Sequence, residues 1–276
     1  MADRRDVTEM NAFPHAGQTA LVTGASSGLG TEFARQLAAR GSNLILAARS
    51  ADRLHTLAGE IEQAHQVRVD VMPTDLTDHA AVTALGEQTR GRVHLLVNNA
   101  GFGSYGPFAG LDPDREYEQV LVNDAALVAL TRAVLPQMLQ RRTGGVLNVA
   151  STIAFQPGPY QAVYSATKAF VLSFTEALRI ETRGSGVRVL ALCPGPVQTS
   201  FLATLGDDRA AHTPIYSRLD RADRVVTVGL RALDHDRGTV IPGTRNTLLA
   251  WGPRFTPRAV TARISGRLLR PTAGQP

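Results

Sequence analysis

The sequence predicts one α/β domain, in which a doubly wound parallel sheet of about seven strands is flanked by helices. Short β-branched or apolar runs alternate with longer amphipathic runs, and this order is typical of parallel β–α–β units. The chain has 276 residues, of which 43% are hydrophobic, so one large core is expected. No repeat, linker or low-complexity segment divides the chain.

The expected strands are short runs rich in β-branched and other apolar residues. In chain order they cover residues 19–23, 43–48, 67–72, 93–97, 145–150, 187–192 and 239–241. The longer amphipathic runs between them predict helices over residues 28–40, 51–64, 78–89, 114–140, 162–183 and 222–234. Ser50 is placed to cap the second helix. Residues 194–219 are expected to be irregular.

The two ends of the chain differ from the domain between them, which we expect over residues 18–244. Residues 1–17 are polar and mixed in charge, and they predict a flexible lead-in rather than a secretory leader. Residues 245–276 form a basic extension with six arginines and no acid, whereas 23 basic and 24 acidic residues precede it. The high isoelectric point therefore belongs to the tail, and nucleic-acid binding by the domain is not indicated.

Other protein classes are disfavoured by composition. The longest apolar run, residues 120–139, contains an Asn–Asp pair at 123–124, Arg132 and Pro136, which do not suit a membrane span. Cys193 is the only cysteine, and the seven histidines lack ligand-like spacing. We expect no disulfide framework, no metal site and a cytoplasmic location.

The tail predicts a short basic amphipathic helix. Its apolar and basic residues recur side by side, as Val260, Ile264 and Leu268 beside Arg263, Arg267 and Arg270. We expect this apolar stripe to pack on the domain or on a neighbouring subunit. The alternative is peripheral contact with an anionic membrane surface, or with an acidic substrate carrier.

A glycine-rich turn follows the first expected strand and opens the first helix. Its sequence over residues 23–30 is TGASSGLG, with the spacing G-x-x-x-G-x-G. Glycines let the backbone approach a pyrophosphate, and a helix N-terminus supplies unpaired N–H groups and a positive dipole end. A plain tight turn is the alternative, but the placement after the first strand favours a nucleotide site.

The end of the second strand favours NADP as the nucleotide. An NAD site would normally place an acid there for the ribose 2′-hydroxyl, but the residues are Ala47-Ala48-Arg49. An arginine can pair with the 2′-phosphate in a charge-assisted bond. The alternative is that Arg49 is one of many solvated arginines.

Three side chains predict proton-transfer chemistry at the carboxyl edge of the sheet. Ser151 follows the expected strand 145–150, and Tyr164 and Lys168 lie four apart on the next helix, so they share one face. A cation beside a phenol favours the phenolate and is expected to move the phenol pKa towards the working range. Ser151 can orient a substrate oxygen and stabilise charge on it. Lys168 is the only lysine in a chain that otherwise uses arginine, which argues against an incidental surface pair.

With these motifs in this order, residues 18–243 resemble the short-chain dehydrogenase/reductase family in its compact single-domain branch. The resemblance implies a Rossmann-type fold and four catalytic residues, Asn123, Ser151, Tyr164 and Lys168. It implies that bound NADP(H) exchanges a hydride with a carbonyl or alcohol, while Tyr164 transfers the proton. Lys168 would hold the ribose, and Asn123 would hold a water behind the lysine. The implied cofactor-binding residues are Gly24, Ser26, Ser27, Gly28, Leu29, Gly30, Arg49, Asp75, Leu76, Asn99, Ala100, Gly101, Tyr164, Lys168, Pro194, Gly195, Val197 and Thr199.

The resemblance also implies where the substrate would bind. The family's substrate pocket corresponds here to Ser151, Ile153, Phe155, Phe102, Tyr105, Phe201 and Leu202. Because most of these side chains are apolar and bulky, a hydrophobic ketone or 3-oxoacyl substrate is expected, although ordinary packing would also account for each of them. The family usually pairs its long helices, so a homodimer or homotetramer through 114–140 and 162–183 is expected.

Two other readings remain open. A non-catalytic NADP-sensing regulator would share the fold, although a sensor need not keep all four catalytic residues. A nucleotide-sugar epimerase of the longer sister branch is disfavoured by the chain length and the glycine spacing.

Overall fold

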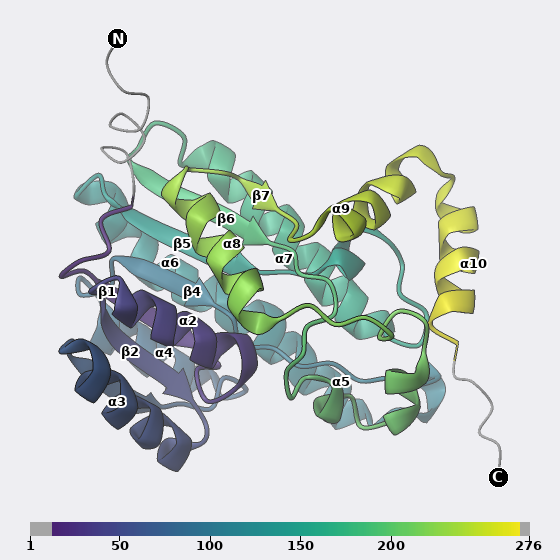
Figure 1. Ribbon diagram of the computed structural model, residues 1–276, viewed down its shortest axis with the longest axis horizontal. Coiled ribbons are helices and arrows are strands. Elements are labelled where there is room, and N and C mark those ends of the chain that lie inside the picture. The colour runs from purple at the N-terminus through teal and green to yellow at the C-terminus, as the bar shows by residue number, and fades with distance from the viewer. Residues whose placement is uncertain (1–12, 271–276) are drawn as a thin grey trace.

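A parallel sheet forms the centre of the molecule, and it confirms the predicted fold class. The computed structural model describes residues 13–270. The seven strands lie in the order β3-β2-β1-β4-β5-β6-β7, and every pairing is parallel (Figure 1). Their bounds are β1 Thr19–Thr23, β2 Asn43–Ala48, β3 Val69–Pro73, β4 Leu95–Asn98, β5 Gly144–Val149, β6 Val187–Leu192 and β7 Thr239–Val240.

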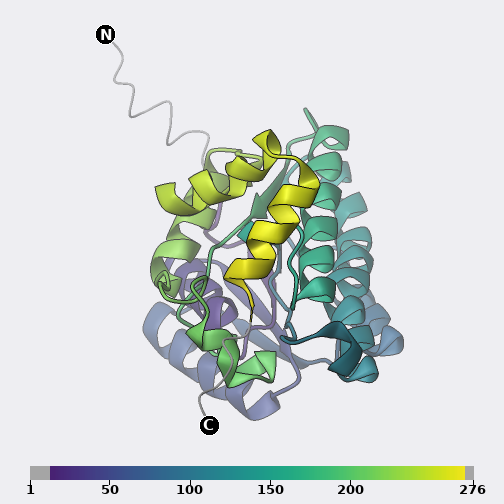
Figure 2. The same cartoon turned by 90° about the vertical axis from the view of Figure 1, so that its right-hand side faces the viewer.

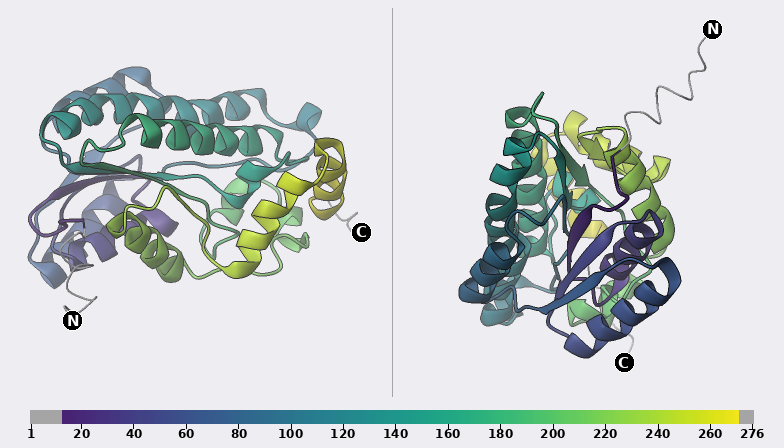
Figure 3. Two further views of the ribbon diagram at one scale, coloured as in Figure 1. Left: turned by 90° about the horizontal axis from the view of Figure 1, so that it is seen from above. Right: turned by 90° about the vertical axis from the view of Figure 1, so that its left-hand side faces the viewer.

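Helices cover both faces of the sheet (Figure 3). On one face, α2 (Gly28–Ala39), α3 (Ala51–His65) and α8 (Ala222–Asp234) pack on inward side chains such as Val22 and Leu46. On the other face, α4 (His79–Thr89), α6 (Ala126–Gln140) and α7 (Ala162–Glu181) pack on side chains such as Leu21 and Ile45. Successive strand residues point to opposite faces, and both faces are buried, which explains the nearly continuous apolar strands.

The strand order places the ligand site. The chain builds β1, β2 and β3 towards one edge, returns to β4 on the other side of β1, and then continues to β7. The strand order therefore reverses between β1 and β4. In open sheets of this kind a crevice forms at the reversal, beyond the carboxyl ends of the strands, and ligands bind there.

The helix predicted over residues 114–140 is interrupted. It consists of α5 (Pro113–Val120), a π-helical turn over Leu121–Ala125, and α6. A π-turn widens the helix locally and is often found at functional sites. By length and composition, Pro113–Gln140 is apolar enough to cross a membrane. Its inward side chains Leu130, Val134 and Met138 nevertheless lie in the core beneath the sheet, as in a core helix.

Ser50 is the N-cap residue of α3, as predicted, and α4 and α5 have side-chain caps that were not predicted. Ser50 directly precedes α3, but its side chain makes no capping hydrogen bond. Asp78, by contrast, accepts a hydrogen bond from the backbone N–H of Ala80 at the start of α4.

The expected flexible lead-in over 1–17 is wrong for residues 13–17, and residues 1–12 lie outside the described part of the chain. Phe13 is buried in the core, and the Arg188 guanidinium lies over its ring at 5.8 Å. The His15 ring bonds to Asp234 at 2.8 Å, and the same carboxylate accepts from Arg40 at 2.9 Å. A single aromatic anchor in a polar segment gives no periodic signal, which is why sequence pattern alone missed it.

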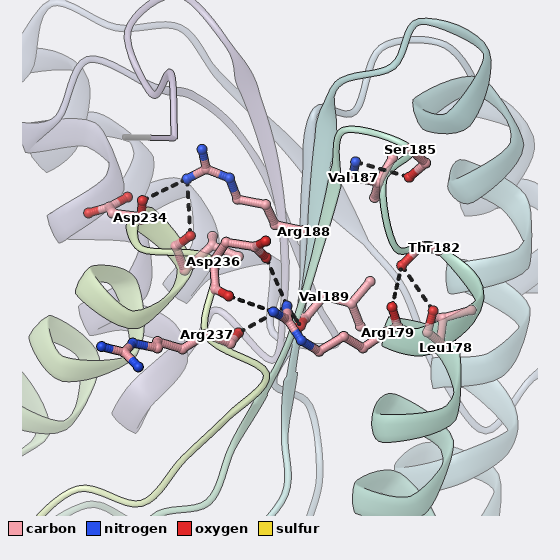
Figure 4. A network of polar contacts seen from close by, with 11 residues as sticks. Leu178, Arg179, Thr182, Ser185, Val187, Arg188, Val189, Asp234, Asp236 and Arg237 are labelled. Atoms are coloured by element: carbon pink, nitrogen blue, oxygen red, sulfur yellow. Dashed lines mark hydrogen bonds and ion pairs between the residues drawn. The ribbon is translucent and has the colours of Figure 1, made fainter. Parts of the chain in front are cut away.

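A polar network ties α7, β6 and the end of α8 together (Figure 4). The Arg179 guanidinium donates to the Asp236 carboxylate at 2.8 Å and to the Val189 carbonyl at 3.2 Å. Arg188 donates to the Asp234 carbonyl at 2.8 Å. These residues flank the amino-terminal half of β6, away from the carboxyl ends of the strands. We therefore infer that this network stabilises the fold.

The C-terminal extension forms two helices, α9 (Thr244–Trp251) and α10 (Arg258–Leu268). The expected helix is confirmed as α10, but its apolar stripe does not pack on the domain, so of the two expected places only a neighbouring subunit stays as a prediction. Val260, Ile264 and Leu268 are 41%, 50% and 37% exposed, whereas Thr261 and Ser265 are buried. At Gly266 an added Cβ would lie in ordinary van der Waals contact with Pro159, at 3.5 Å, so this part of α10 lies beside the domain.

Candidate active site

The glycine-rich turn after β1 is tightly packed against its surroundings. Gly24 and Gly28 have φ values of +65° and +55°, which strongly favour glycine. A Cβ on Gly30 would lie 2.1 Å from the Gly24 carbonyl oxygen, so no larger residue fits there without moving the backbone. Because these positions carry no side chains, a phosphate-bearing ligand can approach the backbone of the turn closely.

The N-terminus of α2 opens from this turn. Ser27 is the N-cap, and its side chain makes no capping hydrogen bond. Ser26, Ser27, Gly28 and Leu29 all line one cavity, so the first turn of the helix faces an open space. Its N–H groups and the positive end of the helix dipole suit a pyrophosphate.

The segment after β4 supports the turn. Asn99 donates from its side-chain amide to the Thr23 carbonyl at 2.9 Å, and the Thr23 hydroxyl accepts from the backbone N–H groups of Asn99 and Ala100, both at 3.1 Å. Beneath the sheet, the Asn98 amide donates to Asn148 at 2.9 Å. These bonds fix β1 and β4 at the switch point.

The far end of the cavity is basic. Arg49 follows β2 and lines the cavity, together with Arg53 at the first turn of α3. Asp75 lines the same end, and hydrogen bonds from Thr77, with the Arg49 charge as a smaller cause, hold its carboxyl pKa below the usual value. Sequence analysis missed Arg53, although its spacing of four residues from Arg49 was a usable signal.

Ser151 and Tyr164 face each other across the middle of the cavity. Ser151 follows β5, and its hydroxyl accepts from the Ile153 N–H at 3.3 Å. Tyr164 lies in the first turn of α7, and its ring is 5.3 Å from the Phe201 ring. Burial raises the Tyr164 phenol pKa, and hydrogen bonding with Ser151 offsets only part of this rise.

Lys168 lies on the same face of α7 as Tyr164, as predicted. Its ammonium donates to the Val149 carbonyl at 2.9 Å and lies 5.8 Å from the centre of the Tyr164 ring. Burial lowers the Lys168 pKa to about 8, while the nearby Asp124 carboxyl favours the protonated form. The expected lowering of the Tyr164 phenol pKa is therefore wrong, because desolvation by burial raises it.

Asn123 lies behind this wall, in the π-turn. Its amide donates to the Phe102 carbonyl and the Thr167 hydroxyl, each at 3.0 Å, and its side-chain oxygen accepts from the Phe102 N–H at 3.1 Å. Asn123 is buried and does not line the cavity. Its bonds hold the segment after β4 against α7, next to Lys168.

One cavity of about 520 Å³ brings the predicted residues together. Every predicted cofactor-binding residue lines it except Gly30, which packs beneath the turn. Of the predicted substrate-binding residues, Ser151, Ile153, Phe102, Phe201 and Leu202 line it. Tyr105 and Phe155 do not, so their predicted placement on the pocket wall is wrong.

Tyr105 instead holds the C-terminal segment against the domain. It is 2% exposed, and its hydroxyl donates to the backbone carbonyl of Leu269 at 2.6 Å. Leu269 is fully buried against Ile153 and Tyr164. The segment after α10 therefore backs the pocket wall, and sequence analysis did not foresee this because the contact joins residues far apart in the chain.

Further polar and apolar residues on the wall were also missed. Gln156, Gln161, Ile215 and Tyr216 line the cavity, and the Gln161 amide donates to the Tyr216 hydroxyl at 3.1 Å. Ile215 and Tyr216 lie in the stretch expected to be irregular, which carries no periodic signal. The described residues hold no group of three or more side chains suited to a metal ion.

Comparison with known proteins agrees with this geometry. The family model for short-chain dehydrogenases matches residues 18–210. The chain belongs to the short-chain dehydrogenase family. It is 34% identical to the 17-beta-hydroxysteroid dehydrogenase type 3 of Rattus norvegicus over 71% of this chain, and the match spans only 65% of that relative. It is 39% identical to sulfoacetaldehyde reductase 2 of Chromohalobacter salexigens, over 71% of this chain and 79% of that relative.

The fold has a similar solved structure. A short-chain dehydrogenase from Sphingobium yanoikuyae in complex with NADPH superposes with a TM-score of 0.78 at 30% identity, covering 94% of this chain and 98% of that one. The Rossmann-type architecture of this chain is therefore shared with that structure over almost the whole length of both.

Proposed function

We propose that this short-chain dehydrogenase uses NADP(H) to interconvert a hydrophobic carbonyl compound and its alcohol. The observation that carries the proposal is that the glycine turn, Arg49, Ser151, Tyr164 and Lys168 all line one cavity. The cradle fits a dinucleotide because the α2 N-terminus and the close turn suit a pyrophosphate. Bound NADPH would supply the hydride.

The side chains of the chain itself handle the substrate oxygen and its proton. In the reducing direction, Ser151 orients the carbonyl oxygen, and the Tyr164 hydroxyl donates a proton to that oxygen as negative charge develops. Burial keeps Tyr164 protonated at neutral pH, which suits a proton donor. Lys168 is placed to bond the cofactor ribose, and Asn123 holds the neighbouring backbone in position.

The preference for NADP is supported by the basic end of the cavity. Arg49 and Arg53 line it where β2 ends in Ala48, and no acid follows β2 directly, although Asp75 lines the same end beside Arg49. The solved relative from Sphingobium yanoikuyae was found with NADPH.

Replacing Arg49 with alanine is expected to raise the KM for NADPH about tenfold and to leave the KM for NADH nearly unchanged. The reason is the loss of one charge-assisted bond to the 2′-phosphate. Steady-state kinetics with both cofactors measures the change. Arg35→Ala is the matched control, because Arg35 is an exposed arginine paired with Glu60 on the surface. An unchanged ratio of the two KM values would contradict the assignment of Arg49.

The pH dependence follows from Lys168. Its pKa of about 8 means that the ammonium is present below this pH and is lost as the pH rises. We expect kcat/KM for NADPH to fall tenfold per pH unit above about 8, because kcat/KM reports ionisation in the free enzyme. A profile that stays flat well above this pH would show that the charge of Lys168 is not needed for binding.

The substrate end of the cavity favours an apolar ketone or 3-oxoacyl compound. Phe102, Ile153, Phe201 and Ile215 line it. Two relatives are named for a steroid or a very-long-chain 3-oxoacyl substrate, the rat 17-beta-hydroxysteroid dehydrogenase type 3 and the very-long-chain 3-oxoacyl-CoA reductase of Bos taurus, whereas a third is named for sulfoacetaldehyde.

Replacing Leu269 with alanine is expected to raise kcat/KM for bulky ketones several-fold relative to small ones. Removing this fully buried side chain frees volume behind Ile153 and Tyr164. The same change should lower the free energy of unfolding by about 2–4 kcal/mol. Leu268→Ala is the matched control, since Leu268 is exposed on the same helix. An unaltered size preference in a folded Leu269→Ala protein would remove Leu269 from the pocket wall.

NADPH consumption in the presence of ketones, aldehydes and 3-oxoacyl thioesters tests the proposed function. We expect turnover that is fastest with large apolar ketones or 3-oxoacyl compounds. Tight NADPH binding with negligible turnover on every carbonyl would instead favour the alternative, a non-catalytic NADP-sensing regulator.

We further propose a cytoplasmic homodimer or homotetramer. The helices α5 and α7 carry exposed apolar side chains, among them Tyr117, Phe170 and Ile180, which a partner subunit would cover. Mass measurement in solution tests the assembly, and a monomer at all concentrations would contradict it.

A further inference from the structure

The C-terminal arm, which we define as residues 244–270, gathers exposed apolar side chains. Fourteen large apolar side chains are exposed among the described residues, and seven of them lie on this arm. They are Leu248, Leu249, Trp251, Phe255, Val260, Ile264 and Leu268. Phe255 is 86% exposed and Leu248 is 75% exposed. A patch of this density marks an interaction surface rather than ordinary scatter.

The arm is also strongly and purely basic. Its six arginines are Arg245, Arg254, Arg258, Arg263, Arg267 and Arg270, and it contains no acid. All six are exposed, and none forms an ion pair with another described residue. The Arg254 guanidinium stacks over the Trp251 ring at 4.6 Å. The surface therefore offers apolar groups and unpaired positive charge side by side.

The arm is fixed to the body of the protein, so this surface is held in place. Ala250, Thr261, Ser265 and Leu269 form its buried side. The Asn246 amide donates to the Asp220 carboxylate at 2.7 Å, in addition to the bond from Tyr105 to Leu269. Figures 1 and 2 show α9 and α10 together at one end of the molecule, where the arrow of β7 points. The carboxyl ends of the strands and the active-site cavity lie towards this end.

We propose that the C-terminal arm docks this protein on an anionic lipid bilayer as a peripheral surface contact. Bulky apolar side chains can enter the boundary between headgroups and acyl chains, and arginines beside them pair with anionic headgroups. The positive charge of the arm favours an anionic bilayer over a second copy of this chain as the partner of this surface. Two copies meeting through this same face would bring twelve arginines together without a single acid from either arm, which is repulsive.

Docking would place the active-site cavity close to the lipid phase. This placement helps catalysis only if the substrate is apolar, as the proposed function states. Leu269 ends the arm directly beside Tyr164. A carbonyl compound dissolved in the membrane would then have a short path to the cavity, without crossing water.

Trp251 makes the proposal directly measurable, because it is the only tryptophan of the chain and it is 45% exposed within the patch. The experiment adds phosphatidylcholine vesicles, with or without phosphatidylserine, to the full-length protein in the absence of substrate and cofactor. We expect a blue shift of Trp251 fluorescence and co-flotation with the phosphatidylserine vesicles, and weakening of both by salt. Failure of the proposed enzymatic function would not affect this readout.

Two pairs of changes separate the apolar and the basic contributions. Arg263→Gln with Arg267→Gln should weaken vesicle binding about thirtyfold. Leu248→Ser with Phe255→Ser should abolish the blue shift. The matched control is Phe108→Ser with Arg90→Gln, which removes an exposed phenylalanine and an exposed arginine elsewhere and should bind as wild type.

Several outcomes would overturn the proposal. One is the absence of a fluorescence shift with any vesicle, and another is equal weakening in the control pair. A change of oligomeric state in the Leu248/Phe255 variant, without any vesicle binding by the wild type, would assign the face to a second copy. Binding to an acidic carrier protein, but not to phosphatidylserine vesicles, would assign it to a protein partner.

Discussion

Replacement of Tyr164 by phenylalanine is expected to lower kcat by about 10²–10⁴-fold, the usual contribution of a general acid. The change removes only the hydroxyl that donates the proton, while the ring can keep its contact with Phe201. NADPH affinity, measured by fluorescence titration, should stay within about twofold of wild type, because the phenol contributes little to holding the dinucleotide.

Tyr117→Phe is the control for this prediction, since Tyr117 is exposed on α5. The control should leave kcat unchanged. Wild-type turnover in the Tyr164 variant would exclude this residue as the acid, and with it the proposed proton path.

Replacement of Gly30 by alanine is expected to weaken dinucleotide binding by more than about 100-fold. The added methyl group would lie 2.1 Å from the Gly24 carbonyl oxygen and 2.7 Å from the Asn99 amide nitrogen. Because the nearest atom belongs to the backbone, the turn itself must shift. The N–H groups at the start of α2 would then no longer point towards the pyrophosphate. Calorimetric titration with NADPH measures the loss, and circular dichroism shows whether the fold survives.

Gly59→Ala provides the matched control for this change. Gly59 lies inside α3, and an added Cβ there meets no atom within 4 Å. Alanine favours the helix, so this variant should bind NADPH normally and gain roughly 0.5–1 kcal/mol of stability. Normal NADPH affinity in Gly30→Ala would show that the close packing of the turn is not required.

The C-terminal arm has two sides, of which the outer one carries the proposed membrane contact and the inner one packs against the proposed active site. The inner side of the C-terminal arm includes Leu269, which packs against Tyr164, the proposed proton donor. The outer side carries Phe255 and the arginines. A truncation that removes the arm would disturb both at once, so the point changes above are the sharper tests.

The regular elements were predictable because their signals are local. The predicted strand at 43–48 coincides with β2, the one at 187–192 coincides with β6, and the helix at 222–234 coincides with α8. The strand at 19–23 also coincides with β1, and the other boundaries differ by one or two residues, as at 67–72 against β3 Val69–Pro73. The π-turn around Asn123 was not predictable, since an inserted residue in a helix leaves the apolar period almost unchanged.

The sequence by itself determined the order of the parallel units, the glycine turn and the chemical identity of the site residues, because periodicity and motif spacing are properties of neighbouring residues. Only the tertiary structure decided which side of α10 is buried, that Leu269 backs the pocket, and that burial raises the Tyr164 pKa instead of Lys168 lowering it. Burial and desolvation depend on which distant segments meet, and that information is absent from any short stretch of the chain.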